Sequence, residues 1–445
     1  MQNLANKLTK LRLALLSALP AVLFFSYHPI IPIASTKTTN YELSLPLLWL
    51  ALFSLLSFPV IFEKLKRRRF FRLAAILPIY CFTTILWSEN RLRAFLTASI
   101  ILGLEISIFT IPSLIKTDKI KKALTRTLLI SSAAVCVYCW IQCLLNVLNI
   151  NLGFCKGCSY INLGFPHPNG FAIEPQFMGG LLLAPALVSI YILEHNNDKK
   201  QGKGKTNKII LASLILNLLT LFLTLSRGAI FALIIALIIL VFKERRRILK
   251  PLALTAISFI IAISAHGIFA TLAPNPDNFL SGTTKSLSQL TFGLVDPIKP
   301  EIPPAGEMAQ PDSIFDGYIE ESTNDRLDLT KKSLDLSDDT PQNTFLGIGL
   351  GDTGTELYRK FPELGSPKEI AQNQYIAILL ELGLVGVFLI AATISVTAKF
   401  LKFKDQTKRH YLLALVAAYA VSLLFFSGLP NALYIYLLPV VLYSL

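Results

Sequence analysis

Residues 208–243 read KIILASLILNLLTLFLTLSRGAIFALIIALIILVFK, two apolar runs separated only by Ser226-Arg227-Gly228. Each run approaches the length of about 20 apolar residues that a helix needs to cross a bilayer. Similar stretches recur along the whole chain. We expect twelve spans, at about 11–33, 44–62, 72–88, 94–115, 123–149, 172–194, 208–225, 227–243, 250–271, 371–397, 410–428 and 430–445. The sequence therefore predicts an all-α polytopic membrane protein.

The composition agrees with this prediction. Hydrophobic residues make up 53% of the 445 residues and charged residues only 16%, which excludes an ordinary soluble domain of this size. Basic residues precede the first span as in a signal peptide, but no cleavage site with a soluble domain follows, so we expect a retained helix. One long polar segment divides the chain into residues 1–271 with nine spans, the segment 272–370, and residues 371–445 with three spans.

The distribution of Lys and Arg predicts the orientation. Most of the 42 basic residues lie near the N-terminus or in five connections, at 64–72, 116–126, 199–208, 243–250 and 399–409. With twelve alternating spans these all lie on one side, which the positive-inside rule makes cytoplasmic. Both termini are then cytoplasmic and the segment 272–370 is extracytoplasmic. The net charge of +14 thus indicates membrane topology and contact with anionic lipids, not nucleic-acid binding.

The polar segment is acidic and has too few apolar residues for a core of its own. We expect irregular structure from Ala273 to about Ile319, where Pro, Ser, Asp and Asn are frequent. Helix formers follow from Glu320 to Leu336, with a cap at Asn324 or Asp325, and a second short helix is expected at about 352–361. The segment should be a large extracytoplasmic loop of short helices lying over the membrane face.

Cysteine and glycine patterns give weaker signals. Cys155 and Cys158 form a CxxC motif in an outer loop, where a local disulfide or free thiols are favoured over a metal site, because no second ligand pair is near. Three further cysteines, Cys136, Cys139 and Cys143, should act as small apolar residues on one helix face. The run Gly347–Gly351 follows no βαβ unit, so it predicts a turn or helix start and not a cofactor loop.

Two arginines are candidates for chemistry. Arg227 lies between two spans at their outer ends, where a charge at membrane depth usually marks function. Its planar donors suit a phosphate, although a snorkelling arginine in a tight hairpin is the plainer alternative. Arg326 lies about twenty residues before the glycine run, and an ordinary surface arginine paired with a neighbouring aspartate is its alternative.

A third group of polar residues, Gln372-Asn373-Gln374-Tyr375, begins the tenth span, and Glu381 lies a few turns deeper. An unpaired carboxylate there would be costly. The plainer interpretation is an interfacial helix cap followed by one buried, hydrogen-bonded carboxyl group.

With these residues in place, the chain resembles the O-antigen ligase and polysaccharide polymerase superfamily. Three features carry the resemblance, namely Leu225–Ala229 between two spans, Arg326 before Gly347–Gly351, and the stretch from Asn373 to Gly386. Each motif is weak alone, but their order within residues 170–400 and the late large outer loop are fairly specific.

The resemblance implies a GT-C-like, metal-independent glycosyltransferase without a cofactor. Such enzymes transfer a glycan from an undecaprenyl-pyrophosphate carrier to a glycan, lipid or protein acceptor at the outer face of the bacterial inner membrane, in lipopolysaccharide or exopolysaccharide assembly. Arg227 and Arg326 would hold the pyrophosphate, with Arg91 and Arg93 as weaker candidates. Cationic donors stabilise the charge that develops on such a leaving group. The resemblance also implies that Gln372, Asn373 and Tyr375 contact the substrate.

The chain departs from the family pattern at the proposed base. Ligases of the family typically carry histidine directly before the asparagine, where this chain has Gln372, and glutamine cannot take a proton. Glu174 is our preferred replacement as catalytic base, and His167 is the second candidate. The alternative interpretation of Glu174 is a carboxylate that a helix N-terminus stabilises, with no part in the reaction. The missing histidine moves the expectation modestly from ligase to polymerase.

Two other classes of protein stay open. A secondary transporter or a flippase for lipid-linked glycans is the main alternative, since twelve spans suit a transporter. Transporters tend to show repeat symmetry and helix breaks at the midplane, and the sequence shows no repeat. An inactive binding or scaffold protein is the second alternative, because of Gln372.

Overall fold

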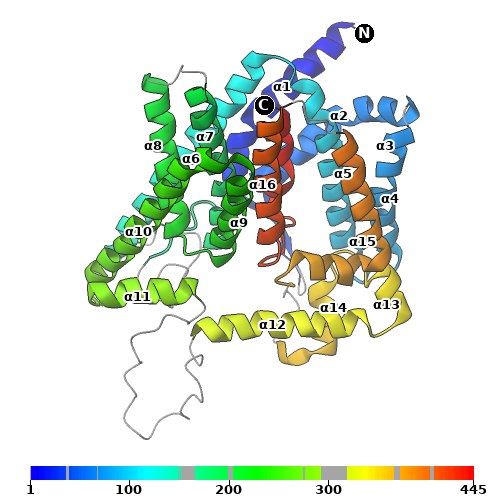
Figure 1. Ribbon diagram of the computed structural model, residues 1–445. Helices are drawn as coiled ribbons and strands as arrows, with labels where there is room; N and C mark the ends of the chain where they lie inside the picture. The colour runs from blue at the N-terminus through cyan, green and yellow to red at the C-terminus, as the bar shows by residue number, and fades with distance from the viewer. Residues whose placement is uncertain are drawn as a thin grey trace, which may run out of the picture. The chain divides into compact units, whose positions relative to one another are not determined.

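The computed structural model describes residues 2–36, 40–67, 69–148, 150, 152, 166–198, 204–273, 276–291, 318–364, 371–400 and 405–444. These residues are mostly helical (Figure 1). They fall into two compact units, one made of Met1–Leu128 with Asp328–Leu445 and the other of Leu129–Leu327. The helix α6 (Asp118–Val147) begins in the first unit and ends in the second, and α12 (Tyr318–Ser337) runs from the second back into the first.

The remaining elements of the first unit are α1 (Gln2–Phe24), β1 (Ile30–Ser35), β2 (Asn40–Ser44), α2 (Leu45–Arg67), α3 (Arg69–Ala74), α4 (Ile76–Thr83), η1 (Thr84–Leu86), α5 (Arg91–Leu114), α13 (Pro341–Leu346), α14 (Thr353–Lys360), η3 (Pro362–Leu364), α15 (Gln374–Phe400), α16 (Gln406–Ser422) and α17 (Leu433–Ser444). Those of the second unit are α7 (Pro175–Asp198), α8 (Lys205–Leu223), α9 (Arg227–Glu244), η2 (Arg245–Ile248), α10 (Leu249–Leu272) and α11 (Phe279–Leu290).

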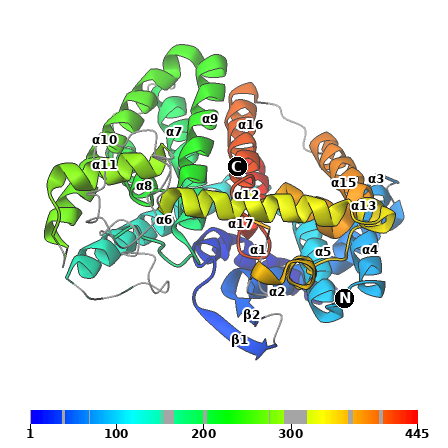
Figure 2. The same ribbon diagram turned by 90° about the horizontal axis from the view of Figure 1, so that it is seen from below.

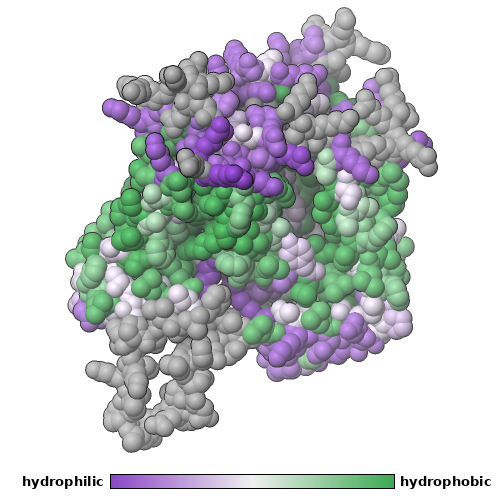
Figure 3. Space-filling model, in the orientation of Figure 1, coloured by the Kyte–Doolittle hydropathy of each residue, from purple (hydrophilic) through white to green (hydrophobic). Residues whose placement is uncertain are grey.

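Seven helices among the described residues are long and apolar enough to cross a membrane. They are the helical stretches Leu45–Leu65, Arg91–Leu114, Asp118–Val147, Pro175–His195, Thr206–Leu223, Leu249–Leu272 and Gln374–Lys399, and two shorter apolar stretches are Phe71–Leu86 and Leu433–Tyr443. Figure 3 shows apolar side chains gathered along the helix flanks, with hydrophilic side chains towards the helix ends. The prediction of a polytopic helical membrane protein is confirmed at this level, and twelve spans stay a prediction.

The first expected span, 11–33, is wrong in its second half. Helix α1 ends at Phe24, and residues 30–35 instead form a strand that pairs antiparallel with β2, from Ile30↔Ser44 to Ser35↔Asn40 (Figure 2). Pro29 and Pro32 cannot donate a helical hydrogen bond, and the β-branched isoleucines between and after them favour an extended backbone. The fold is therefore helical with one small hairpin, not strictly all-α.

The span expected at 72–88 is also interrupted, because α3 ends at Ala74 and α4 begins at Ile76. Pro78 has no N–H group to donate to the carbonyl of Ala74, so the regular helix breaks there. Ala75 and Thr84 nevertheless keep helical backbone angles, so Phe71–Leu86 remains one apolar helical stretch, shorter than the expected span.

The long polar segment contains more structure than expected. Residues 279–290 form the helix α11, capped by the Asn278 side chain, which accepts a hydrogen bond from the Ser281 amide at 2.7 Å. The expected irregular structure is therefore wrong for these residues. Helix α12 begins at Tyr318 and not at a cap at Asn324 or Asp325, which both lie inside it. The second expected short helix is present as α14. Residues 292–317 lie outside the described part of the chain.

Within the first unit, the short helices of the polar segment share a core with α15. Leu329 and Leu336 of α12, Ile348, Leu357 of α14 and Leu380 of α15 pack into one buried cluster. The short helices thus gain from α15 the apolar contacts that they cannot provide themselves. This packing anchors them at the first turns of a membrane-spanning helix.

Candidate functional site

In the second unit, Arg227 is the first residue of α9. The turn before it is sharp, because Leu225 has a left-handed backbone with φ of 49°. Ser226 caps the helix, its hydroxyl accepting a hydrogen bond from the Ala229 amide at 3.2 Å. A helix N-terminus carries a partial positive charge, so this end of α9 combines that charge with a guanidinium and suits an anion.

The N-terminal ends of α7 and α9 pack closely together. A Cβ atom on Gly179 of α7 would lie 2.8 Å from the Cβ of Ala229 and 3.0 Å from that of Ser226. Glu174 directly precedes α7, and its carboxylate accepts a hydrogen bond from the Gln176 side chain. The structure therefore brings Glu174 and Arg227 to the same end of the second unit.

A buried amide network supports the segment that carries His167 and Glu174. The Gln142 side chain of α6 donates to the Asn169 side-chain oxygen at 2.8 Å and accepts from the Gly170 amide at 3.1 Å. Asn169 in turn donates to the Ala172 carbonyl at 2.8 Å. Because buried amides are costly to leave unsatisfied, this network fixes the segment against the C-terminal part of α6.

The end of α8 is held at the same place. The buried His266 ring of α10 hydrogen-bonds the Leu223 carbonyl at 3.1 Å, four residues before Arg227. His167 is close enough to His266 for the two imidazoles to interact electrostatically. His167, Glu174 and Arg227 thus belong to one end of the second unit, which is built by helices α6 to α10 and residues 166–174.

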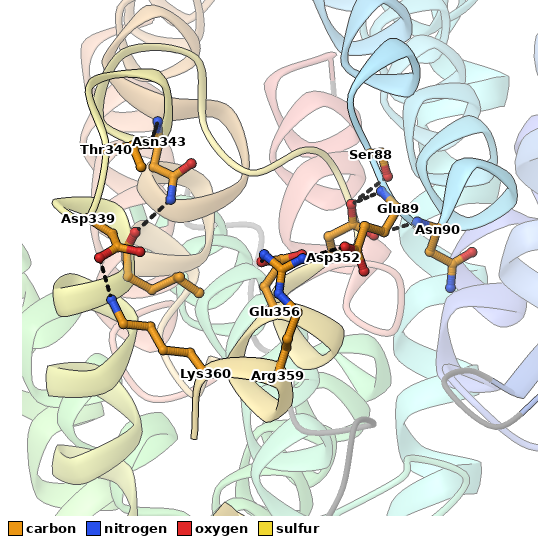
Figure 4. Close-up of polar contacts among 11 residues, drawn as sticks. Ser88, Glu89, Asn90, Asp339, Thr340, Asn343, Asp352, Glu356, Arg359 and Lys360 are labelled. Atoms are coloured by element: carbon orange, nitrogen blue, oxygen red, sulfur yellow. Dashed lines mark hydrogen bonds and ion pairs between the residues drawn. The ribbon is translucent and has the colours of Figure 1, made fainter. Parts of the chain in front are cut away.

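In the first unit, the structure places a polar cluster where α14 meets the loop before α5 (Figure 4). The Asp352 carboxylate is fully buried and accepts three hydrogen bonds, from the Ser88 hydroxyl at 2.7 Å and the amides of Glu89 and Asn90 at 2.7 and 2.9 Å. Arg359 pairs with the carboxylates of both Glu89 and Glu356. Burial raises the pKa of Asp352, against the lowering effect of its donors.

Sequence reasoning missed this cluster. The glycine run was recognised as a turn, but the aspartate directly after it was not singled out. Its partners lie more than 260 residues earlier in the chain, and no sequence periodicity links residues 88–90 to residues 352–359. The only available signal was an aspartate before a short helix, which predicts no more than a cap.

Glu356 makes the stability of the protein depend on pH. Burial raises its pKa to about 7, Arg359 opposes this, and the Glu89 and Asp352 carboxylates add to it. The pKa of Glu356 in the folded state therefore lies above its unfolded value of about 4.3, so the folded state binds the Glu356 proton more tightly. The stability that this proton contributes falls as pH rises from about 4.3 to about 7.

We expect Glu356→Gln, which is always neutral, to lose less thermal stability than the wild type between pH 5 and pH 8. Unfolding of the detergent-solubilised protein at both pH values measures this difference. Glu363→Gln is the control, because a backbone hydrogen bond and the Lys332 ammonium lower the pKa of the exposed Glu363. That variant should not reduce the loss. An unchanged loss in Glu356→Gln would contradict the prediction.

Helix α15 is broken a few turns after its start. Gly383 has φ of 61° and ψ of −170°, and the carbonyls before it turn away from helical partners. The amides of Ile348 and Gly349 donate to the carbonyls of Leu380 and Glu381 at 2.9 and 3.1 Å. The Tyr80 hydroxyl donates to the Leu382 carbonyl at 2.9 Å. The amides of the glycine run therefore replace the helical donors that these carbonyls would otherwise have. The sequence predicted a turn at the glycine run, but not this contact with α15.

Glu381 sits at this break. Its carboxylate accepts a hydrogen bond from the Thr353 hydroxyl at 2.7 Å, and the Gly351 backbone also hydrogen-bonds it. The interpretation as a hydrogen-bonded carboxyl group therefore holds for Glu381. Arg93 of α5 is near enough to interact with this carboxylate electrostatically.

The residues at the start of α15 have structural partners. The Asn373 side chain caps the helix by accepting from the Tyr375 and Ile376 amides at 2.9 and 3.3 Å, and the Tyr375 hydroxyl donates to the Ala420 carbonyl at 2.8 Å. The cap was one of the interpretations of this group. Gln372 directly precedes Asn373 and is partly buried.

The buried side chain in this group is Gln374, which sequence reasoning did not select. Its side-chain oxygen accepts hydrogen bonds from the Gly428 and Leu429 amides, and the backbone N–H of Gln374 donates to the Leu423 carbonyl at 2.9 Å. It therefore fixes the connection between α16 and α17 to the start of α15.

The other predicted residues are spread over both units. Arg91, exposed, and Arg93, partly buried, lie on the first turn of α5 in the first unit. Arg326 is partly buried within α12. Cys155 and Cys158 lie outside the described residues. In the part of the chain that the structure describes, no three His, Cys, Asp or Glu side chains form a group that could hold a metal ion.

Comparison with known proteins assigns the central part of the chain. Residues 212–391 match the model of a family described as O-antigen ligase. This region includes Arg227, Arg326 and the start of α15, and begins after Glu174. No curated protein matches the chain. The resemblance inferred from the motifs is confirmed for residues 212–391, which match the O-antigen ligase family.

Proposed function

We propose that the protein transfers a glycan from an undecaprenyl-pyrophosphate carrier to an acceptor hydroxyl during surface polysaccharide assembly. The family match over residues 212–391 carries this proposal, because the family implies a ligase or polymerase role. The reaction takes place at the extracytoplasmic face of a bacterial inner membrane, with both termini of the chain cytoplasmic. It needs no metal ion.

Arg227 binds the pyrophosphate of the donor. Its position at the first residue of α9 adds a guanidinium to the partial positive charge of the helix N-terminus, and both favour the negative charge that grows as the glycosidic bond breaks. Arg326 is the second cation for the same group. The leaving lipid pyrophosphate takes the electron pair of the broken bond.

Glu174 accepts the proton of the attacking hydroxyl. The packing of α7 on α9 through Gly179 supports this role, because it brings Glu174 to the end of the unit where Arg227 lies. A carboxylate can take a proton that Gln372 cannot. The oxygen of the acceptor hydroxyl then forms the new glycosidic bond, and His167, in the same unit as Glu174, contacts the sugar.

A transfer assay tests the proposal. The wild-type protein, reconstituted in liposomes with an undecaprenyl-pyrophosphate oligosaccharide, should extend the glycan on the carrier into a ladder, the product of a polymerase. Transfer of a single block to a second lipid would support the ligase instead, despite Gln372. Labelled glycan that crosses the bilayer without any transfer would contradict the proposal and establish a transporter.

A further inference from the structure

The helix α13 belongs to the polar segment, but its last turn exposes two large apolar side chains. Phe345 is 55% exposed and Leu346 is 37% exposed, whereas residues 347–350 directly after them are buried. The helix packs on α15, and Figure 1 shows it beside the ends of α4 and α15. Water contact with this pair would be unfavourable, so the surroundings of α13 indicate what covers it.

The exposed pair continues the apolar flanks of the neighbouring helices in the first unit. Leu86, at the end of the apolar stretch that contains α4, is 78% exposed, and Phe388 of α15 is 71% exposed. The Tyr80 hydroxyl lies within 2.9 Å of the carbonyls of both Leu346 and Leu382, so it joins α4, α13 and α15. The flanks of membrane-spanning helices face lipid, and the exposed turn of α13 belongs to the same surface.

Helix lengths place this turn within the thickness of the bilayer. From Gly383, where α15 breaks, the 16 residues to Lys399 rise about 24 Å at about 1.5 Å per residue. The hydrocarbon core is about 30 Å thick, so a core that starts near Lys399 extends past Gly383. A Cβ atom on Gly383 would lie 2.5 Å from the Phe345 carbonyl. The last turn of α13 therefore lies at the depth of the break in α15.

The backbone at this depth has the hydrogen bonds that a hydrocarbon environment requires. The amides of residues 348 and 349 donate to the broken turn of α15. The Trp87 indole Nε1–H donates to the Gly347 carbonyl at 3.2 Å, next to the two carbonyls that the Tyr80 hydroxyl contacts. Non-helical backbone is tolerated at membrane depth where protein buries it, and Trp and Tyr are the usual side chains at the bilayer interface.

We infer that residues 345–349 form a re-entrant element, and that Phe345 and Leu346 insert between the acyl chains of the bilayer leaflet at this end of α15. The partner of the exposed turn is thus lipid, and the polar segment does not lie wholly over the membrane face. Helix α14, whose last turn carries Arg359 and Lys360, stays outside the hydrocarbon. The inference requires only that α15 spans the membrane, so it goes beyond glycan transfer and does not depend on it.

Photolabelling of the wild-type, full-length protein in liposomes tests the contact without any substitution. One phospholipid probe carries a diazirine in the upper half of an acyl chain, a second probe carries it on the head group, and mass spectrometry locates the label. We expect the acyl-chain probe to label Phe345 and Leu346, as it labels Phe388 of α15. Tyr358 of α14 is the matched control, because its exposure of 38% nearly equals the 37% of Leu346; it should carry no acyl-chain label.

The two possible failures have distinct readouts. Label on Phe345 and Leu346 from the head-group probe alone would place α13 over the membrane face and overturn the inference. Label from neither probe would mean that protein, such as a second copy of this chain, covers the turn, and would overturn it as well. Loss of glycan transfer is measured separately and leaves the labelling result unchanged.

Thiol reactivity gives an independent measurement on the same pair of positions. Leu346→Cys and Tyr358→Cys are reconstituted in liposomes and treated with a charged, membrane-impermeant maleimide, and the two peptides are followed by mass spectrometry. The thiolate is the reacting form, and a charge is costly in the bilayer, so Leu346→Cys should react at least about tenfold more slowly. Equal rates would overturn the inference. If Leu346→Cys does not fold, Phe345→Cys takes its place with the same expectation.

Discussion

Replacement of Arg227 by alanine is expected to lower kcat/KM for glycan transfer by about 10²–10³-fold, the usual loss when one donor that stabilises transition-state charge is removed. The guanidinium leaves the N-terminus of α9, but the Ser226 cap and its bond to the Ala229 amide remain. The fold should therefore survive. Transfer kinetics in liposomes, with thermal unfolding measured in parallel, check both expectations.

Two further variants test whether the loss depends on the planar guanidinium group and on its position at the start of α9. Arg227→Lys keeps the charge but loses the planar fork of donors, so an intermediate rate is expected. Lys243→Ala removes a basic residue from the last turn of the same helix, at the end away from the anion site, and should transfer at the wild-type rate. Equal rates for Arg227→Ala and Lys243→Ala would remove Arg227 from the reaction.

The helices and the Arg227 turn could be predicted from the sequence because their causes are local. Bilayer thickness sets the length of an apolar helix, and a short polar interruption between two such runs predicts a tight turn. The runs on either side of Arg227 accordingly appear as α8 and α9, with Ser226 as the cap. Polar residues at the ends of such helices also follow from the sequence, as for Asn373 at α15.

The features that could not be predicted depend on contacts between distant segments. Gly383 lies in an apolar stretch that predicts an unbroken helix, and the partners of the broken turn come from the separate run around Ile348. Asp352 lies far in sequence from Ser88. Two prolines divide the first apolar stretch, but only pairing with residues 40–44 turns its second half into a strand. Tertiary contacts decide each of these cases.

Gly383→Ala is expected to destabilise the protein by about 2–6 kcal/mol, because two costs combine. Its φ of 61° with ψ of −170° lies in a region that essentially only glycine adopts, which costs about 1–3 kcal/mol for other residues. A Cβ atom would also lie 2.5 Å from the carbonyl carbon and oxygen of Phe345 and 2.6 Å from the Gly347 amide nitrogen. Such overpacking costs a further 1–3 kcal/mol, roughly.

Gly204→Ala is the matched control for this glycine. Gly204 has φ of −89°, and a Cβ atom there would meet nothing within 4 Å, so its unfolding midpoint should equal that of the wild type. Straightening of α15 would relieve the strain at Gly383 but would take the acceptors at Leu380 and Glu381 from the amides of residues 348 and 349, at about 1–3 kcal/mol for each buried amide left unsatisfied. The midpoint of Gly383→Ala should therefore fall by either route, and an unchanged midpoint would mean that the glycine run does not hold the break in α15.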